Sequence, residues 1–270
     1  MSTADRVPVR KTYKLFIGGE FPRSESGRSY AAEGAWVARA SRKDLRDAVR
    51  VARGASEAWA ARTAYNRAQV LYRVAEIMEG RRQQFVDEGA GAAEVDDAID
   101  RWVWYAGWAD KVQQVVGTVN PVAGPFFDFT VSEPVGVVGV AAPEAPALLG
   151  LVSRLAPVLA GGNVAVVLAS ESAPRSAVTL AEVLATSDVP PGVVGVLTGY
   201  KAELLPWLAA HRDVDAIDLT GAPGELLAAL EEAAADSVKR VVRAAAPLGE
   251  SPADVVAFLE AKTVWHPIGQ

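Results

Sequence analysis

The chain has 270 residues, half of them hydrophobic, and a formal net charge of −6 at pH 7. This size and composition exclude global disorder and suit one large α/β domain, or a domain with an appendage. Acidic and basic residues are interleaved, which argues against a nucleic-acid partner. The longest uncharged stretch, 155–170, is too short and too interrupted to span a bilayer. The N-terminus lacks an apolar signal core, which favours the cytoplasm.

The sequence contains no cysteine and only two histidines, His211 and His266. The absence of cysteine excludes disulfides, thiolate metal sites, iron–sulfur clusters and a thiol nucleophile. Two histidines argue against a histidine metal centre or a Ser–His–Asp relay. We therefore expect no metal site, and we read His211 as a surface residue.

The N-terminal part divides into a flexible segment, 1–12, and a meander with helices, 13–119. Tyr13–Ile17 is predicted to be a strand that ends in a glycine turn, and extended structure resumes at Tyr30.

Three helices are predicted to follow the meander. The first begins at Ser41, with Asp44 completing a capping box. Asn66 is predicted to cap the second helix, and the third spans 92–116 on an apolar stripe. Trp104 and Trp108 lie off that stripe, so the third helix is apolar on two sides. This pattern fits burial between layers of one subunit, and equally a subunit interface, where aromatic residues concentrate.

The segment 120–247 alternates strands and helices in a regular order. The predicted strand cores are Val135–Val140, Val164–Leu168, Val193–Leu197, Val214–Leu219 and Val238–Arg243. The predicted helices between them are Leu148–Leu159, Pro174–Ala185, Lys201–Ala210 and Glu225–Ala235. This order predicts a doubly wound, mostly parallel, five-stranded Rossmann-like sheet. Before it, Phe126–Val131 is a short extended piece.

The last segment, 248–270, leaves the α/β alternation. Phe258–Trp265 alternates as a half-buried strand does, and it comes too late to join the parallel sheet. An unpaired strand at a terminus needs a partner, either within the chain or outside it.

Several motifs, taken in order, resemble the aldehyde dehydrogenase superfamily. They are KLFIGGEF (14–21), EPVGVVGVAAP (133–143), LAPVLAGGN (155–163), PPGVVGVLTG (190–199), HRDVDAIDLTG (211–221), VKRV (238–241) and EAKTVW (260–265). The closest likeness is to the degenerate second module of family-sixteen aldehyde dehydrogenases. The resemblance implies a dinucleotide-binding fold and a terminal strand that builds oligomers.

The chain departs from the family pattern where the aldehyde and the adenosine ribose would bind. Ala145 stands where the resemblance implies an oxyanion-stabilising Asn, and we interpret the preceding Glu144 as loop chemistry left after function was lost. Ala169 stands where the family has a ribose-binding Lys, which leaves Glu171 to accept ribose hydroxyls. Glu171 also fits a solvated loop position, which we favour.

The pyrophosphate turn and the base position depart as well. The family's Thr-Gly-Ser turn is Thr220-Gly221-Ala222 here, which fits a vestigial phosphate site and also an ordinary helix start, the interpretation we favour. The next family glycine falls near Leu226, where a side chain blocks close backbone approach. The general base falls at Ala244, and the catalytic domain with its cysteine is expected to be missing.

Aldehyde oxidation in this family needs a thiolate, an oxyanion donor and a base, and the sequence offers none of them. We therefore predict no catalytic residues. The vestigial cofactor-binding positions are Pro143, Ala169, Glu171, Thr220, Gly221 and Ala222.

The first hypothesis is a pseudoenzyme subunit that assembles with an active aldehyde dehydrogenase or with itself. The predicted interface residues are Trp104, Trp108, Phe127, Phe129, Phe258, Lys262, Val264 and Trp265. Lys262 is read as lying on a solvated face or in an interface ion pair of little energy. The alternative is a module that binds NAD or NADP without thiol chemistry; the pseudoenzyme reading expects no cofactor.

Overall fold

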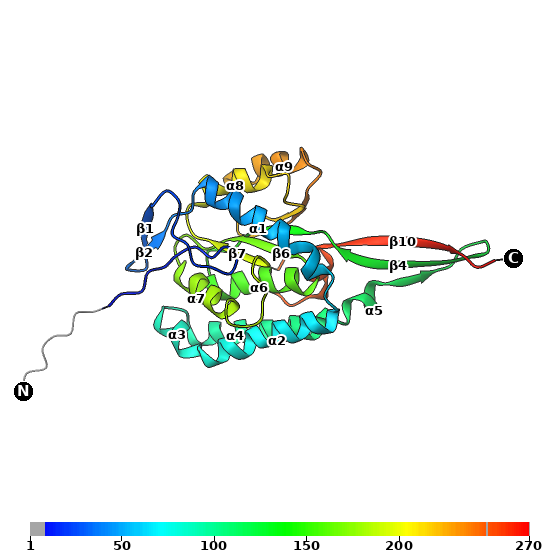
Figure 1. Ribbon diagram of the computed structural model, residues 1–270, viewed down its shortest axis with the longest axis horizontal. Helices are drawn as coiled ribbons and strands as arrows, with labels where there is room; N and C mark the ends of the chain where they lie inside the picture. Colours follow the sequence, from blue (N-terminus) through cyan, green and yellow to red (C-terminus); the bar gives the residue numbers. More distant parts are fainter. Residues whose placement is uncertain (1–8, 247, 270) are drawn as a thin grey trace, which may run out of the picture.

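The computed structural model describes residues 9–246 and 248–269. A layered body carries a long arm of strands that projects from one end, while the chain enters at the opposite end (Figure 1). Within the described part of the chain, no helix is both long and apolar enough to cross a membrane.

The body is built on a five-stranded sheet in the order β7-β6-β5-β8-β9, with every neighbouring pair parallel. The strands are β5 (Val137–Ala141), β6 (Val164–Leu168), β7 (Val194–Leu197), β8 (Ala216–Asp218) and β9 (Arg240–Val242). The predicted doubly wound sheet is confirmed, although β8 and β9 are shorter than their apolar runs. From β5 the chain winds outward through β6 and β7, then crosses to β8, so the strand order reverses between β5 and β8.

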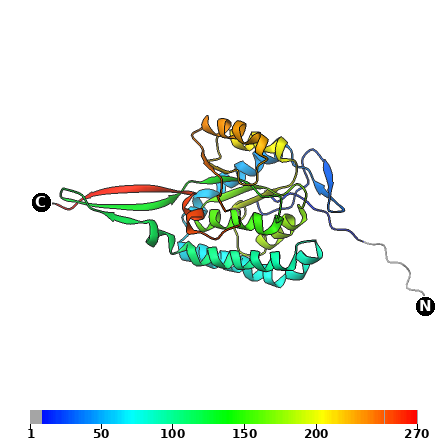
Figure 2. The ribbon, with the colours of Figure 1, turned by 180° about the vertical axis from the view of Figure 1, so that it is seen from behind.

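Helices cover both faces of this sheet (Figures 1 and 2). On one side lie α1 (Arg42–Ala60), α8 (Lys201–Ala210) and α9 (Leu227–Ala235), the last preceded by the short 3-10 turn η1 (Gly224–Leu226). On the other lie α6 (Ala147–Ala160) and α7 (Arg175–Leu184), with α2 (Ala64–Gly80) and α4 (Ala92–Ala109) packed outside α6. One continuous hydrophobic core joins the N-terminal helices to the sheet.

The N-terminal meander differs from the prediction at Tyr13–Ile17. This stretch forms isolated bridges rather than a strand: Tyr13 meets Val37, and Phe16 exchanges two backbone hydrogen bonds with Val196 of β7 at 2.8 and 2.9 Å. The regular hairpin comes later, from β1 (Ser29–Ala32) and β2 (Ala35–Ala38).

The helix starts follow their caps. The predicted Ser41–Asp44 capping box is confirmed. The predicted cap at Asn66 is wrong, because Thr63 caps α2 and Asn66 only donates its N–H to the Thr63 hydroxyl at 3.1 Å.

The predicted third helix, 92–116, is also wrong in its extent. It ends at Ala109, the Lys111 ammonium bonds the carbonyl of Gly107 in the last turn, and α5 (Val112–Val116) follows separately. The stripe predicted for the second helix reaches Phe85, but that helix ends at Gly80 and Phe85 lies in a separate short helix, α3 (Arg82–Asp87).

The arm is a three-stranded antiparallel sheet in the order β10-β4-β3. β10 (Leu259–Pro267) pairs over its full length with β4 (Phe126–Pro134), and β3 (Thr118–Asn120) lies along the other edge of β4. The terminal strand therefore has its partner within the chain. The predicted half-buried character is wrong, because most β10 side chains on both faces are exposed where the arm extends beyond the body (Figure 1).

Candidate functional site

A cavity of about 530 Å³ opens at the point where the strand order reverses. Ligands of open α/β sheets bind in this crevice, outside the carboxyl ends of the strands. Its walls are Pro143, Glu144, Ala145, Thr220, Gly221, Ala222, Ala246, Leu248 and Gly249. Four of the six predicted cofactor-binding positions line it, namely Pro143, Thr220, Gly221 and Ala222. Ala169 and Glu171 do not.

The turn Thr220-Gly221-Ala222 has no backbone donor free for a ligand, because each of its N–H groups is bonded within the chain. The acceptors, in order, are Asp218 Oδ1 at 2.9 Å, the carbonyl of Ala141 at 3.0 Å and the carbonyl of Leu219 at 3.0 Å. The Thr220 hydroxyl also accepts the N–H of Ala244 at 2.9 Å. Phosphate binding at such a turn depends on free N–H groups that point at the anion.

Gly221 is explained by packing within the chain. A Cβ at this position would lie 2.2 Å from the carbonyl oxygen of Ala142, so only glycine lets the turn approach the end of β5 so closely. The helix after the turn begins with η1, and the side chain of Leu226 packs against the core. The turn is therefore held for structural reasons that need no ligand.

Glu144 differs from the prediction that it is loop chemistry left after function was lost. Its carboxylate is the centre of a network at the carboxyl ends of β5 and β6, rather than an idle loop group. It accepts hydrogen bonds from the hydroxyls of Ser170 (2.9 Å) and Ser172 (3.0 Å) and from the N–H groups of Glu171 (3.0 Å) and Ser172 (3.2 Å). It also forms an ion pair with Lys201.

Lys201 was missed because it reads as one more residue of an apolar helix. It lies in the first turn of α8, yet its side chain is only 1% exposed. Its ammonium bonds the carbonyls of Ala142 and Gly221 as well as the Glu144 carboxylate. The sequence signal for this pair was the single acidic residue, Glu144, in an otherwise apolar loop. Acidic and basic side chains are rarely buried unless they are paired, so Glu144 indicated a cationic partner.

The protonation of Glu144 reflects this network. Burial by itself raises the pKa of the Glu144 carboxyl group. The hydrogen bond and charge of Lys201, with the N–H groups of Ser172 and Glu171, outweigh burial and lower the pKa to about 2. Glu144 is therefore a carboxylate at neutral pH, and a negative charge stands at the cavity wall.

Glu171 and Ala169 lie in environments that differ from both predictions for this loop, a ribose contact and a solvated position. The Glu171 carboxylate accepts the backbone N–H of Lys201 at 2.6 Å, so it caps α8 and is only partly exposed. Ala169 is buried and continues the backbone pairing of the sheet, donating its N–H to the carbonyl of Leu197 at 3.0 Å. The solvated reading of Glu171 is therefore wrong, and its capping bond leaves this carboxylate oriented toward the helix.

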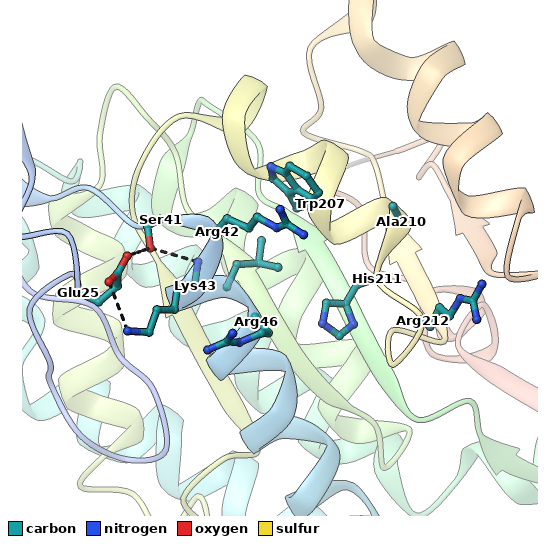
Figure 3. A pocket seen from close by; sticks show the side chains of 10 residues that line it. Glu25, Ser41, Arg42, Lys43, Arg46, Trp207, Ala210, His211 and Arg212 are labelled. Atoms are coloured by element: carbon teal, nitrogen blue, oxygen red, sulfur yellow. Dashed lines mark hydrogen bonds and ion pairs between the residues drawn. The ribbon is translucent and has the colours of Figure 1, made fainter.

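A second hollow, of about 650 Å³, lies between the start of α1 and the end of α8 (Figure 3). The Arg42 guanidinium carbon lies 3.6 Å from the centroid of the Trp207 ring. The Glu25 carboxylate accepts hydrogen bonds from the Ser41 hydroxyl and the Lys43 ammonium. His211 also lines it, at the surface and partly buried, and burial lowers the pKa of its imidazole. Exposed basic side chains dominate this hollow.

Among the described residues, no group of three or more histidine, cysteine, aspartate or glutamate side chains is placed to hold a metal ion.

The predicted interface residues fall into three groups. Phe127, Phe129, Lys262, Val264 and Trp265 lie on the arm, where Lys262 pairs with Glu133 of the neighbouring strand at 2.9 Å. Phe258 is fully buried in the core, so its side chain is not part of the surface. Trp104 and Trp108 are partly buried and pack against the chain's own core.

Comparisons with known proteins agree on one family. The sequence profile of the Aldehyde dehydrogenase family matches residues 30–253. The chain is 33% identical over 249 residues to aldehyde dehydrogenase, cytosolic 1, of Elephantulus edwardii, covering 84% of this chain and 49% of that protein. It is 32% identical over 252 residues to human retinal dehydrogenase 2, covering 86% of this chain and 48% of that protein.

Solved structures are also similar to this chain in fold. The NAD+ complex of an aldehyde dehydrogenase from Bacillus cereus superimposes with a TM-score of 0.79 at 26% identity, over 86% of this chain and 50% of that one. HpcC from Thermus thermophilus gives a TM-score of 0.81 at 30% identity, over 86% of this chain and 48% of that one. The chain thus spans about half the length of the relatives it matches.

Proposed function

This chain belongs to the aldehyde dehydrogenase family, and we propose that it serves there as a catalytically inactive subunit, a pseudoenzyme whose role is assembly. The family reaction requires a thiolate, an oxyanion donor and a base. The chain has no cysteine, and alanine stands at the donor position, 145, and at the base position, 244. Losing all three groups leaves no route to turnover by this chain.

The residues of the cavity do not fit the dinucleotide that the fold implies. The backbone donors of Thr220, Gly221 and Ala222 are engaged within the chain. The charged group at the cavity wall is the Glu144 carboxylate, which repels phosphate. The Lys201 ammonium behind it is already paired. This mismatch supports a role other than cofactor chemistry.

The observation that carries the assembly proposal is the exposed apolar surface of the arm. Phe126, Phe127 and Trp265 are 39%, 44% and 58% exposed, on a ribbon that stands clear of the body (Figure 2). The outer edge of β10 is a nine-residue strand edge. Exposed aromatic surface beside an open strand edge marks a site for pairing with another chain.

The backbone register shows which donors face outward from β10. The N–H of Val135 donates to the carbonyl of Phe258 at 3.2 Å, which makes this a hydrogen-bonded pair of the antiparallel ladder. Because such pairs alternate, the N–H groups of Ala261, Thr263 and Trp265 point away from β4. These three donors are available to a strand from a partner.

We propose that the partner is a second copy of this chain or an active aldehyde dehydrogenase subunit in the cytoplasm. The part played by the chain would then resemble that of the degenerate second module of family-sixteen aldehyde dehydrogenases. The exposed aromatic residues and the unpaired edge lie on the same arm, so one partner strand could cover both.

The test changes only the outward edge. Thr263→Pro removes an outward N–H while leaving the β10–β4 bonds, because proline is tolerated where an edge N–H faces solvent. Thr263→Val is the matched control, since it keeps that N–H and loses only the hydroxyl contact with Thr130 at 3.0 Å.

Light scattering of the pure wild-type chain should give a multiple of 28.4 kDa, or the chain should co-purify from its source with a protein identified as an aldehyde dehydrogenase. Thr263→Pro should lose the assembly and Thr263→Val should keep it. A Thr263→Pro variant that assembles as the wild type does would contradict the proposal.

A second candidate, an NAD(P)-binding module, is favoured by the position of the cavity in a fold whose Bacillus cereus neighbour was solved with NAD+. Saturable binding of NAD+ or NADP+ at micromolar concentration would support it.

A further inference from the structure

The network around Glu144 has the donor set of an anion site. Two hydroxyls, two backbone N–H groups and one ammonium converge on a single carboxylate; they belong to Ser170, Glu171, Ser172 and Lys201. Cations, hydroxyls and backbone N–H groups in this arrangement also recognise phosphate oxygens in proteins. The group that they hold is part of the chain itself.

The geometry indicates that the donors are arranged for an anion. Ser170, Glu171 and Ser172 come one residue after the end of β6, so their N–H and hydroxyl groups lie at the carboxyl end of that strand. Lys201 comes from a separate element, α8, and its ammonium is buried, with two carbonyls as its other partners. A buried ammonium requires a negative partner to offset its desolvation. Among the described residues, Glu144 is the one that forms an ion pair with Lys201.

We propose that the side chain of Glu144 is a built-in ligand that fills an anion site at the carboxyl ends of β5 and β6, and that removing it opens this site to phosphate. The Glu144 carboxylate is tethered to the chain beside these donors, which gives it a high effective concentration at the site. A dissolved anion must reach millimolar concentration before it can compete with this carboxylate. The wild-type site is therefore closed to external phosphate. The inference concerns ligand binding alone, so it stands or falls independently of how the chain assembles.

The opened site should bind phosphate weakly. Lys201 supplies one positive charge, while the Glu171 carboxylate accepts the backbone N–H of that same lysine at 2.6 Å and places a second negative charge nearby. Burial, and then the negative charges of Glu171 and Glu144, raise the pKa of the Tyr30 hydroxyl, so this hydroxyl stays neutral and adds no charge. Millimolar dissociation constants are expected for this balance of charges.

The test uses the full chain and inorganic phosphate at constant ionic strength, measured by calorimetry. Glu144→Ala leaves the donors and the cation in place, and it should bind phosphate at least tenfold more tightly than the wild type. Adding Lys201→Met to that variant should abolish the gain. Glu225→Ala is the charge-matched control, since it removes an exposed carboxylate elsewhere and should behave as the wild type does.

Two results would overturn the inference: a folded Glu144→Ala chain that binds phosphate no better than the Glu225→Ala chain, or wild-type binding equal to that of Glu144→Ala. If Glu144→Ala does not fold, Glu144→Ser supplies the measurement, because it removes the carboxylate and shortens the side chain, so that the donors no longer have their ligand. Phosphate should then raise the Tm of Glu144→Ser more than that of the wild type, and an equal shift in both would count against the built-in ligand.

Discussion

Replacing Asp218 by alanine tests the buried ion pair beneath the cavity. Asp218 and Arg154 are both 0% exposed, and the Arg154 Nε lies 2.7 Å from Asp218 Oδ2. The other carboxylate oxygen accepts the N–H of Thr220 at 2.9 Å. Asp218→Ala leaves the buried guanidinium with Asp254 alone, at 3.0 Å. Removing one partner of a buried pair costs about 3–5 kcal/mol.

That loss is large against a total unfolding free energy of about 5–15 kcal/mol. At about 2–4 °C per kcal/mol, the Tm should fall by roughly 6–20 °C. Urea unfolding followed by tryptophan fluorescence measures the loss directly, through the midpoint at constant slope.

The double variant Arg154→Met/Asp218→Leu separates charge burial from loss of the side chain. It removes both charges and should recover part of the stability lost in Asp218→Ala, because an apolar pair can replace a buried ion pair. A loss below about 1 kcal/mol in Asp218→Ala, or no recovery in the double variant, would contradict a stabilising role for this ion pair.

Three further predictions concern stability. Glu144→Gln should be less stable than the wild type by about 1–2 kcal/mol above pH 5, a value reduced for screening because the side chain is 46% exposed. The pKa of Glu144 is about 2 in the folded chain and 4.5 in the unfolded chain, so this difference in stability should shrink as the pH falls from 4.5 toward 2. A stability difference that does not change with pH in urea titrations would contradict this prediction. Gly221→Ala should cost about 1–3 kcal/mol, because its Cβ meets backbone at 2.2 Å, whereas Gly224→Ala, with nothing within 4 Å, should stay within about 0.5 kcal/mol; equal effects would contradict the packing role. Phe258→Ala should lower the free energy of unfolding by about 3–5 kcal/mol, because it truncates a core side chain. Trp265→Ala should leave stability nearly unchanged and weaken assembly, and a larger loss of stability in Trp265→Ala than in Phe258→Ala would contradict these positions.

The sheet could be predicted from the sequence because its signals are local. Apolar runs such as 164–168 are buried on both faces, and the Ser41–Asp44 capping box sets the start of α1 through contacts between residues close in the sequence. The places where the prediction failed depend on distant contacts. Glu144 and Lys201 are 57 residues apart and meet only because the strands before them end at the same edge of the sheet.

The arm shows the same division. Alternation correctly marked Phe258–Trp265 as extended, and the strand is observed from Leu259 onward. Alternation could not reveal that its partner lies far earlier in the chain, at Phe126–Pro134, or that most of the strand extends beyond the body. Phe258 was predicted to be an interface residue at the start of a half-buried strand, yet it is fully buried in the core at the base of the arm.

We propose that the groups of this crevice that could bind a dinucleotide are already occupied within the chain. Calorimetric titration of NAD+ into the pure wild-type chain measures whether this is so. We expect no saturable binding up to millimolar NAD+, because the turn at Thr220–Ala222 has no free donor and Glu144 occupies the neighbouring anion site. Saturable binding at micromolar NAD+ would contradict it.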